Sequence, residues 1–470
     1  MAVENAPARS VSERSALLRD EDSTSEQNDD PKNWPTPRRW LCTIIVACYG
    51  ITSPVSASMV VPALDDMSKD LNIVNSGERQ LLMSIFVLGW GLGPIILGPL
   101  SEVYGRVLVL NTGQTCFIIA NTLCALPRDK WTFIAVRLLA GVMGSGPMSI
   151  GGGVLSDLWR PEERGLSLAI YTVLPLVGPA IGPIAAGYIV QHWSWPWIFY
   201  CTSAFAILAR LVGQVILQET YTPVILRKKL RKAGLESQDD SSEYKSMKNL
   251  KANLARPFIM LGTKPIVQLL AFFMAYLFGL HNMAISIYQS VWQDQYGQSP
   301  SRASLNYIFI AAGLVLGAQL GGPVNDRIYA RMKKRNGGTD SPEIRTVLMY
   351  PASLIVPAGL LWYGWSAEMH LHWIMPNIGI CIFCFGVIVG YQCIQAYVLD
   401  CYPLYAASAM GALTVLRAIA GFSFPIFAPA LNTSLGYGWA STVLAGCACI
   451  IGCSVPFLLS RFGPRLRERM

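Results

Sequence analysis

The sequence predicts an all-α membrane protein in which twelve transmembrane helices form two pseudo-symmetric halves of six. Of its 470 residues, 52% are hydrophobic and only 14% are charged, whereas about 25% of the residues in a soluble domain are charged. The mean hydropathy is +0.39 over the whole chain, which is typical of a protein that crosses the membrane many times. One long polar segment divides the apolar segments into two sets, and a short motif occurs once in each set.

A transmembrane helix needs about 20 predominantly apolar residues to cross the hydrocarbon layer. Twelve segments of the chain meet this requirement, six on each side of the polar segment. In the first half they are residues 40–61, 80–100, 107–126, 131–155, 166–190 and 198–217. In the second half they are residues 265–290, 305–324, 346–365, 373–399, 406–431 and 440–459.

Polar sequence flanks and separates the two sets of spans. We expect residues 1–39 to form a disordered cytosolic tail, because they are polar and lack the pattern of a signal peptide. Residues 40–217 and 265–460 are the two predicted six-helix bundles. Residues 218–264 form a cytosolic middle loop between them, and residues 461–470 form a short cytosolic tail.

The distribution of Lys and Arg predicts that both termini lie in the cytosol. With that orientation, 29 of the 37 basic residues lie in inner segments and five lie in outer loops, and positive residues collect on the cytosolic side of membrane proteins. Attraction of these residues to anionic membrane lipid accounts for the net charge of +8, so no nucleic-acid partner is implied. The expected location is the plasma membrane, with a vacuolar or other internal membrane as the alternative.

An internal repeat indicates that the two halves arose by duplication. The second span ends with Gly-Pro-Leu-Ser-Glu at 98–102, and the eighth ends with Gly-Pro-Val-Asn-Asp at 322–326. Asp157 and Asp400 end the fourth span of their respective halves. Transporters built from two repeated halves bind their substrate near the middle of the membrane, between the halves.

Charged residues at two depths are the candidates for proton coupling and gating. Arg137 lies inside the fourth span, where a cation costs about 2.5–3.5 kcal/mol unless it faces protein or water. We therefore expect it to face inward and to sense proton or substrate charge; the alternative is an arginine that reaches the headgroups. A carboxylate–arginine cluster at the inner face can lock that side shut. Its expected members are Glu102, Arg106 and Asp157, with Asp326, Arg327 and Asp400 as a partial counterpart in the second half.

The fifth span has an unusual pattern of glycine and proline. Proline kinks a helix by removing a backbone donor, and small residues allow helices to approach closely in a membrane. The pattern predicts a bent helix that packs tightly and seals one half against the other. The residues concerned are Gly178, Pro179, Gly182, Pro183 and Gly187.

Polar and aromatic residues at membrane depth are candidates for the lining of a substrate cavity. They are Trp90, Tyr276, His281, Asn282, Tyr391, Gln392, Gln395 and Arg417. No Asp or Glu lies deep in a predicted span, so proton coupling must use the acids of the inner face, Arg137 or a histidine. Asn432 begins the only Asn-x-Ser/Thr sequon, and it falls on a predicted outer loop.

Several classes of protein are excluded by the absence of their motifs. The sequence contains no phosphate-binding P-loop, no Gly-x-Ser-x-Gly nucleophile elbow and no His-Glu-x-x-His zinc motif. We therefore expect no enzyme activity, no ATP-driven transport, no cofactor and no metal site.

The motifs together resemble those of the major facilitator superfamily, in particular its twelve-span drug:proton antiporter branch in fungi. Residues 98–106 are similar to the motif between spans two and three, with Glu102 where Asp is commoner. Residues 137–141 resemble the motif of span four, and residues 178–187 resemble the antiporter motif of span five, with Ala186 at a usual glycine. Asp-Pro-Lys-Asn-Trp-Pro at 30–35 and Glu-Thr-Tyr-Thr-Pro-Val at 219–224 are similar to fungal members.

The resemblance implies a secondary active transporter that exports small hydrophobic organic molecules, such as a drug, toxin or secondary metabolite. Export would occur by proton antiport through alternating access, and the partners would be the substrate, protons and membrane lipid, with the protein acting as a monomer. The main alternative is a proton-coupled importer of a small nutrient, such as a polyamine, vitamin or organic acid. A sensor that has lost transport is a third possibility, but the intact Glu102, Arg106, Arg137 and Gly178 argue against it.

Overall fold

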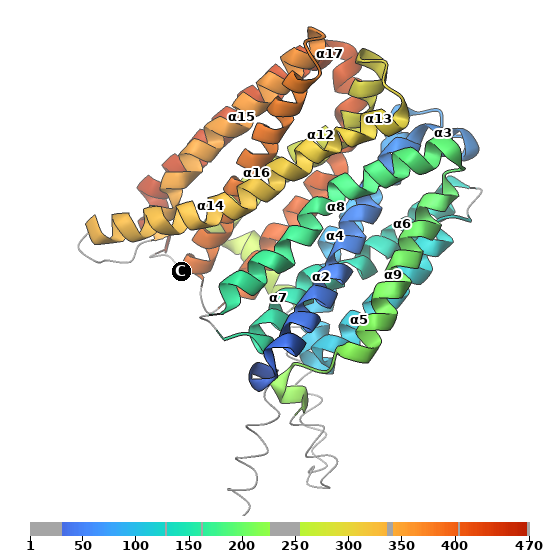
Figure 1. The fold of residues 1–470 in the computed structure, drawn as a ribbon. Coiled ribbons are helices and arrows are strands. Elements are labelled where there is room, and N and C mark those ends of the chain that lie inside the picture. The colour runs from blue at the N-terminus through green and yellow to red at the C-terminus, as the bar shows by residue number, and fades with distance from the viewer. Residues whose placement is uncertain are drawn as a thin grey trace, which may run out of the picture.

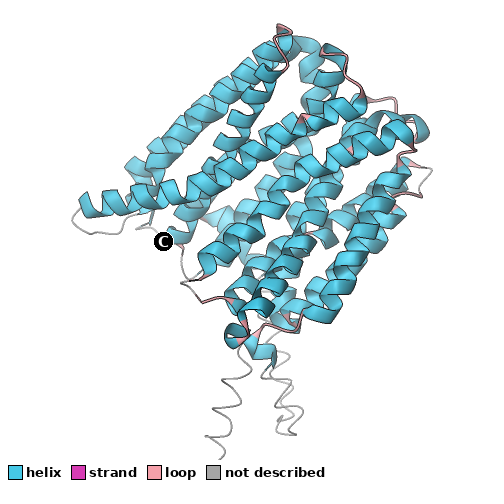
Figure 2. Ribbon diagram, in the orientation of Figure 1, coloured by secondary structure: helices cyan, strands magenta, loops and turns pink. Residues whose placement is uncertain are grey.

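A computed structural model of the chain describes residues 31–126, 129–160, 163–225, 254–335, 342–402 and 405–467. All regular secondary structure in these residues is helical, and the long helices lie side by side in one bundle (Figure 1, Figure 2). Residues 1–30 of the predicted N-terminal tail and residues 226–253 of the predicted middle loop lie outside the described residues.

The first half contains six membrane-crossing units. Five are single helices, namely α2 (Thr36–Ser58), α4 (Ser76–Tyr104), α5 (Arg106–Leu123), α8 (Arg164–His192) and α9 (Pro196–Ile216). The fourth unit is divided into α6 (Lys130–Gly144) and α7 (Gly146–Leu158). The break falls at Ser145 because Pro147 has no N–H to donate to the preceding turn. A short turn η2 (Val61–Ala63) and helix α3 (Leu64–Asp70) follow α2.

The second half repeats this arrangement. It begins with α12 (Pro265–Ser290), which continues into η3 (Val291–Gln295), and goes on to α13 (Pro300–Leu305) and α14 (Tyr307–Arg335). The turn η4 (Pro342–Arg345), α15 (Thr346–Glu368), α16 (Ile374–Cys401) and α17 (Ala406–Arg467) complete it. α17 contains two crossings, because the backbone leaves the helical conformation at Gly436, where φ is +75°. Such a positive φ is readily adopted only by glycine.

The predicted number of twelve crossings is confirmed. Ten helical segments among the described residues are long and apolar enough to span a membrane, and one of these is α17 with its two crossings. α5 supplies the remaining crossing. It has only 18 residues and includes Arg106, Asn111, Gln114 and Asn121, so it is shorter than the other crossings and carries several polar side chains.

The helices extend beyond the predicted spans. α4 begins at Ser76 and ends at Tyr104, whereas the predicted span is 80–100. α2 begins at Thr36, inside the predicted tail, and α17 continues to Arg467, beyond the predicted end of the second bundle. Hydropathy detects the residues that lie in hydrocarbon, whereas helical hydrogen bonding continues into the polar headgroup layer.

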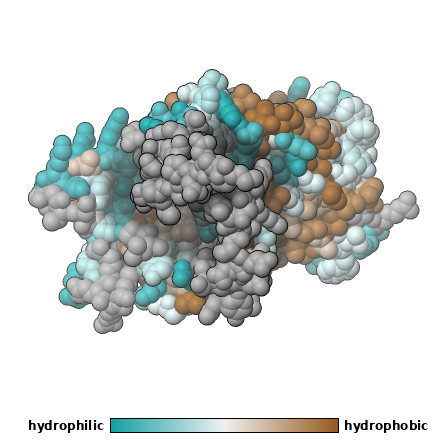
Figure 3. Space-filling view, turned by 90° about the horizontal axis from the view of Figure 1, so that it is seen from below, coloured by the Kyte–Doolittle hydropathy of each residue, from teal (hydrophilic) through white to brown (hydrophobic). Residues whose placement is uncertain are grey.

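The two ends of the bundle differ in how the halves meet. We call the end that carries the α4–α5 turn the inner end, following the predicted orientation, and the opposite end the outer end. Figure 3 views the inner end, where hydrophilic residues gather over one side and a broad hydrophobic area covers the flank on the other. A flank of this kind suits contact with lipid.

From the outer end to mid-depth, the two halves pack against each other through small residues. Gly91 of α4 lies so close to Ala418 of α17 that a Cβ at Gly91 would overlap the alanine. Nearer the outer end of the same helices, a Cβ at Gly77 would lie 3.5 Å from Ile426. Gly187 of α8 is likewise in contact with Ser304 of α13. These contacts close the space between the halves on the outer side.

Candidate functional site

A cavity lies between the halves at the inner end. Its volume is about 430 Å³, within the range of about 300–1,000 Å³ that is usual for small-molecule sites. α4, α7 and Arg106 at the start of α5 form the wall of the first half. Helices α12, α16 and α17 form the other, together with the helical residues 254–263. The cavity begins on the inner side of the Gly91–Ala418 contact, where Pro94 and Ile95 of α4 and Thr414 of α17 face each other across open space.

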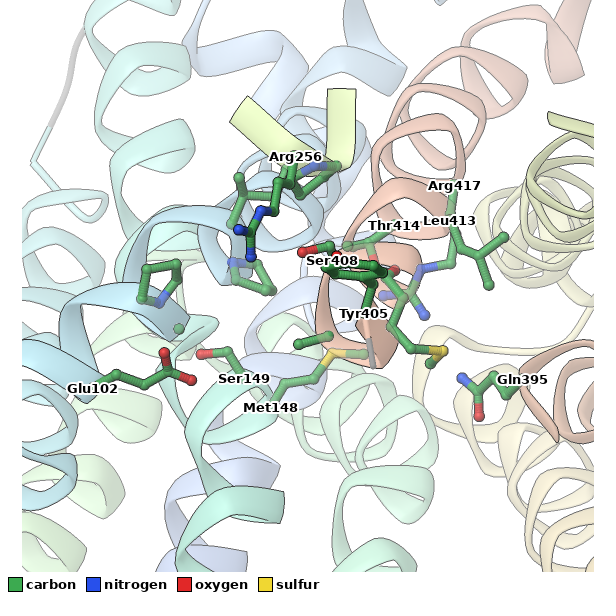
Figure 4. Close-up of a pocket in the computed structure, with 18 of the residues that line it drawn as sticks. Glu102, Met148, Ser149, Arg256, Gln395, Tyr405, Ser408, Leu413, Thr414 and Arg417 are labelled. Atoms are coloured by element: carbon green, nitrogen blue, oxygen red, sulfur yellow. The ribbon is translucent and has the colours of Figure 1, made fainter. Parts of the chain in front are cut away.

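Charged and polar groups of the cavity lie on different walls (Figure 4). Glu102 is on the α4 side, and Arg417 and Gln395 are on the opposite side. Arg417 is the deepest of these residues and is only 6% exposed. Its guanidinium lies 5.1 Å from the ring centroid of Phe278 and 5.9 Å from that of Trp90. Two of the predicted cavity residues, Gln395 and Arg417, therefore line the cavity. Trp90 does not line it, but its ring lies beside the Arg417 guanidinium.

Most of the other predicted cavity residues are engaged in packing within the second half. Tyr276 donates to the Leu444 carbonyl, Asn282 donates to the Phe278 carbonyl of its own helix, and Gln392 donates to the Ala318 carbonyl. His281 is buried beside Cys384, with 4.0 Å between its Nδ1 and the sulfur. Tyr391 lies nearer the site, with its ring 6.3 Å from that of Phe278. Hydropathy gives the depth of these residues but not the direction in which they face.

Arg137 is completely buried in the first half, on the α2 side of α6. Its Nη1 donates to the Ser56 hydroxyl at 2.8 Å, and its Nη2 donates to the Ser56 carbonyl. The guanidinium also lies 4.3 Å from the ring centroid of Phe86 and 5.5 Å from that of Phe199. Among the described residues no carboxylate pairs with it. A buried cation held only by neutral groups responds strongly to any change of charge nearby, because the surrounding dielectric is low.

The inner-end cluster of the first half is built around Arg106. Its Nε lies 3.6 Å from Asp157 Oδ2, and both side chains are largely buried, at 13% and 20% exposed. Nη1 donates to the Ser101 hydroxyl at 2.8 Å. Glu102 was predicted as a member, but it makes no ion pair with Arg106 or with another described residue and instead faces the cavity. The turn at Gly105 ends α4 between the two residues, so Glu102 lies on α4 and Arg106 begins α5, and both contribute to the cavity lining.

Glu219 occupies the place in this cluster that the prediction assigned to Glu102. Its carboxylate accepts hydrogen bonds from the backbone N–H groups of Arg106 and Val107, at 2.9 Å and 3.3 Å. It therefore caps the N-terminus of α5, where a negative charge is favourable. Gly105 has φ of +107°, and any Cβ there would collide with the Glu219 carboxylate. The turn thus requires glycine for two reasons.

The second half has a matching cluster around a different arginine. Arg345 in η4 lies 2.9 Å from Asp326 and 3.0 Å from Asp400. Its guanidinium also lies 4.2 Å from the ring centroid of Tyr329. Sequence reasoning proposed Arg327 as the counterpart of Arg106, but Arg327 is exposed and Arg345 makes the pairs. Arg345 precedes α15 as Arg106 begins α5, so it has the equivalent position at the start of the third crossing.

The glycine and proline residues of α8 line its contact with α2. A Cβ at Gly178 would lie 2.6 Å from the Pro54 side chain, and one at Gly182 would lie 2.6 Å from the Val55 carbonyl. Pro179 and Pro183 lie within the helix. Together with the contact of Gly187 to the second half, these residues bring α8 against both neighbours without space for a larger side chain.

Asn432 lies within α17, four residues before its break at Gly436, and is half-buried. The sequence predicted an outer loop at this position. The first crossing of α17 extends past the sequon, with apolar residues on both sides of it, and the helical backbone is interrupted only at Gly436.

Two residues that build the clusters were missed from the sequence. Glu219 was noticed only as part of the Glu-Thr-Tyr-Thr-Pro motif, which in the structure is the segment that caps α5. Arg345 is one of six Lys and Arg residues in a polar loop, so nothing in the sequence distinguishes it from its neighbours. Arg345 would have been found by comparing the start of the third crossing in each half, where Arg106 stands in the first half, instead of comparing the two copies of the motif.

The sequence matches the Major Facilitator Superfamily over residues 46–425. It is 49% identical to the MFS-type transporter oryF of Aspergillus oryzae, with 98% of each chain covered. It is 41% identical to the efflux pump vrtL of Penicillium aethiopicum, with 93% of this chain and 88% of that protein covered. A probable efflux pump of Aspergillus flavus, mfs2, is 35% identical over 87% of this chain and 99% of its own length.

Solved transporter structures share the fold at low sequence identity. The xylose transporter XylE from E. coli, in a partially occluded inward-open conformation, aligns with a TM-score of 0.63 and 12% identity over 90% of this chain and 99% of that chain. A bacterial homologue of the human lysosomal transporter Spinster, inward-facing and unoccupied, aligns with a TM-score of 0.64 and 14% identity over 92% and 99%. Twelve crossings in two repeated halves, a cavity between them and these similarities agree: the chain belongs to the major facilitator superfamily and is a multi-pass membrane transporter rather than an enzyme.

Proposed function

We propose that this transporter exports small hydrophobic organic molecules by exchange for protons, through alternating access of the cavity to the two sides of the membrane. The observation that carries the proposal is the asymmetry of the interface between the halves. α4 and α17 are in contact at Gly77 and Gly91 and part beyond them, where the cavity begins. A cavity that is closed on one side and lined from both halves on the other fits one of two alternating states.

The relatives support export as the direction. Proteins 41% and 35% identical to this chain are named efflux pump and probable efflux pump, and we extend that activity to this chain. The small residues of α8 fit the same proposal, because Gly178 and Gly182 leave no gap between α8 and α2 through which ions could leak. We place the protein in the plasma membrane as a monomer, with both termini in the cytosol.

Proton coupling requires a group that gains and loses a proton as the protein changes state. The described residues offer two carboxylates near the cavity: Glu102, which lines it, and Asp157, which is largely buried against Arg106. Protonation of Asp157 would remove its attraction to Arg106 and loosen the inner end of α7 from α5. Arg137 lies deeper and without an anionic partner. We assign it the role of sensing charge in the transport path, since its field is weakly screened at that depth.

The test is transport into everted membrane vesicles, whose interior corresponds to the outside of the cell. Vesicles carrying the full chain are given an acidic interior and a panel of hydrophobic fluorescent compounds that includes acids, bases and neutral molecules. We expect accumulation without ATP, and its loss when an ionophore dissipates the pH gradient. Asp157→Asn should abolish the gradient-driven part.

Two results would contradict the proposal. Accumulation in right-side-out vesicles under an inwardly directed proton gradient would indicate import, and uptake that does not change with the gradient would exclude proton antiport. Vesicles with an empty vector provide the baseline. A Glu163→Gln variant serves as the matched carboxylate control, because Glu163 pairs with Arg39 at the inner end and does not line the cavity.

A further inference from the structure

The guanidinium of Arg417 has no anionic or hydrogen-bonded partner in the described part of the protein. The residue is 6% exposed and lies on α17 at the deep end of the cavity. Its contacts are with the faces of two aromatic rings, those of Phe278 and Trp90. A guanidinium has five N–H donors in a fixed planar arrangement, and a buried charge is costly unless it is paired. The side on which a partner can reach Arg417 is the cavity.

Gln395 increases the hydrogen-bonding capacity of the same wall. It lies on α16, lines the cavity on the Arg417 side (Figure 4), and its side chain makes no hydrogen bond to a described residue. Apolar side chains such as Met274 and Leu413 lie on the same wall, and the Thr414 hydroxyl is engaged with the Met410 carbonyl of its own helix. The site therefore combines apolar surface with two polar side chains whose donors are available to a ligand, which is the usual composition of a small-molecule site.

The charges of the other cavity residues do not neutralise Arg417. Glu102 is the acid of the lining, but it lies on the opposite wall near the mouth and forms no ion pair with Arg417. Two further arginines line the cavity: Arg106 of the first half, which pairs with Asp157, and Arg256 of the second half, whose guanidinium lies 5.5 Å from the ring centroid of Tyr405. Neither supplies the negative charge that would balance Arg417.

We infer that the cavity takes organic acids: molecules with an apolar, preferably aromatic, body and a carboxylate or comparably acidic group that pairs with Arg417. Planar anions suit this position because a guanidinium binds them through two parallel hydrogen bonds. The aromatic rings of Trp90 and Phe278 would flank the bound group. The inference names the substrate class of the proposed exporter, so it rests on that proposed function, but it concerns binding and is testable without transport.

The experiment measures binding to the purified full chain in nanodiscs of phosphatidylcholine. The probes are pyrenebutyrate, which is an anion at neutral pH, and pyrenebutyramide, which has the same ring system and no charge. We expect the wild-type protein to bind the acid about tenfold more tightly than the amide, as a charge-assisted pair requires. Arg417→Gln should remove this preference and leave the affinity for the amide within about twofold, which also shows that the variant is folded.

Controls separate Arg417 from a general effect of positive charge. Arg461→Gln makes the same change on the same helix, at an exposed position outside the cavity, and should keep the preference. Arg417→Lys should retain part of it, because the charge remains and the planar arrangement of donors is lost. Equal binding of acid and amide by the wild-type protein, no binding of either, or an unchanged preference in Arg417→Gln would each overturn the inference.

An anionic lipid headgroup is a second source of the same chemistry. Repeating the measurement in nanodiscs with phosphatidylserine distinguishes the two sources: the inferred site should still bind pyrenebutyrate, whereas loss of binding would assign Arg417 to lipid and overturn the inference. The outcome is independent of the vesicle assay. Arg417-dependent binding of the acid with no gradient-driven transport would refute proton-coupled export but not the inferred substrate class. Gradient-driven transport of neutral compounds alone would support proton-coupled export and refute the inferred substrate class.

Discussion

Replacement of Arg137 by methionine separates its proposed role in coupling from its role in packing. Methionine has an unbranched side chain of similar length, so it fills the space between Phe86 and Phe199 that the arginine stem and guanidinium occupy. The variant loses two hydrogen bonds to Ser56, each worth about 1.5–3 kcal/mol when one partner is charged. It recovers the cost of placing a cation at this depth, about 2.5–3.5 kcal/mol.

The Ser56 hydroxyl keeps a partner after the replacement, which limits the net cost. The Ser56 hydroxyl still donates to Asn121, and Asn121 donates to Ser203 and to the Phe199 carbonyl. We therefore expect Arg137→Met to be destabilised by no more than about 3.5 kcal/mol. Arg137→Ala should lose about 2–5 kcal/mol more, because it also leaves a cavity.

The assay pairs thermal unfolding in detergent with transport in everted vesicles. If Arg137 couples transport to protons, both variants lose accumulation driven by the pH gradient, although methionine retains most of the stability. Arg137→Met should still equilibrate substrate down its own concentration gradient. Full gradient-driven accumulation by Arg137→Met would refute the coupling role. A graded loss of activity that follows stability, with methionine active and alanine inactive, would show that the arginine acts only through packing.

Three further changes test the contacts that shape the two ends of the bundle. Glu219→Ala removes the acceptor of two backbone N–H groups at the start of α5 and should cost about 1–3 kcal/mol in thermal unfolding, whereas Glu219→Gln keeps one acceptor and should cost less. Arg345→Gln leaves two carboxylates facing each other, but one of them is 76% exposed, so the loss should be about 1 kcal/mol or less and should shrink in high salt. Gly187→Val places a branched side chain against Ser304 and should abolish transport by preventing closure of the outer end. The control, Gly165→Val on the same helix, meets no other atom and should be active. Equal transport by the two variants would exclude the Gly187–Ser304 contact as a gate.

The fold was predictable from the sequence because a membrane allows few structures. Backbone groups in hydrocarbon must be paired within the segment, so an apolar run of the right length is a helix. Even α17, whose two crossings are separated only by the break at Gly436, was divided correctly into two spans by the short polar segment around that break. The ends of the helices were not predictable, because hydropathy falls where a helix leaves the hydrocarbon whereas the helix itself continues through the headgroups, as α4 does from Ser76 to Tyr104.

For the candidate site, the sequence predicted how deep the charged residues lie in the membrane but not which way their side chains face or which partners they contact. Arg137 and Arg417 stand out because a charge within an apolar span is rare and costly, and both are indeed buried. Partners were harder to assign. Glu102 and Arg106 are four residues apart, a spacing that would bring them together on one helix, but the glycine turn at 105 ends that helix between them. The contact of Glu219 with α5 joins segments more than a hundred residues apart, which no local pattern reveals.

The position of the polar contacts bears on how the halves can move. Within the described residues, each hydrogen bond and ion pair of the two inner clusters joins residues of a single half: Arg106 with Asp157 and Ser101, and Arg345 with Asp326 and Asp400. These clusters therefore make each half rigid at its inner end and do not tie the halves together.

The contacts between the halves are of a different kind. They pair small or apolar side chains, as at Gly91 and Ala418 or Gly187 and Ser304, and such packing has no directional bonds to break. Two rigid bodies joined in this way can exchange one apolar interface for another, and the free-energy difference between the two states stays small. A ligand shifts such an equilibrium only by the difference in its affinity for the two states. Arg417 lies where this difference can arise, because its guanidinium contacts Trp90 across the interface, so an anion bound to it would act on both halves at the point where they part.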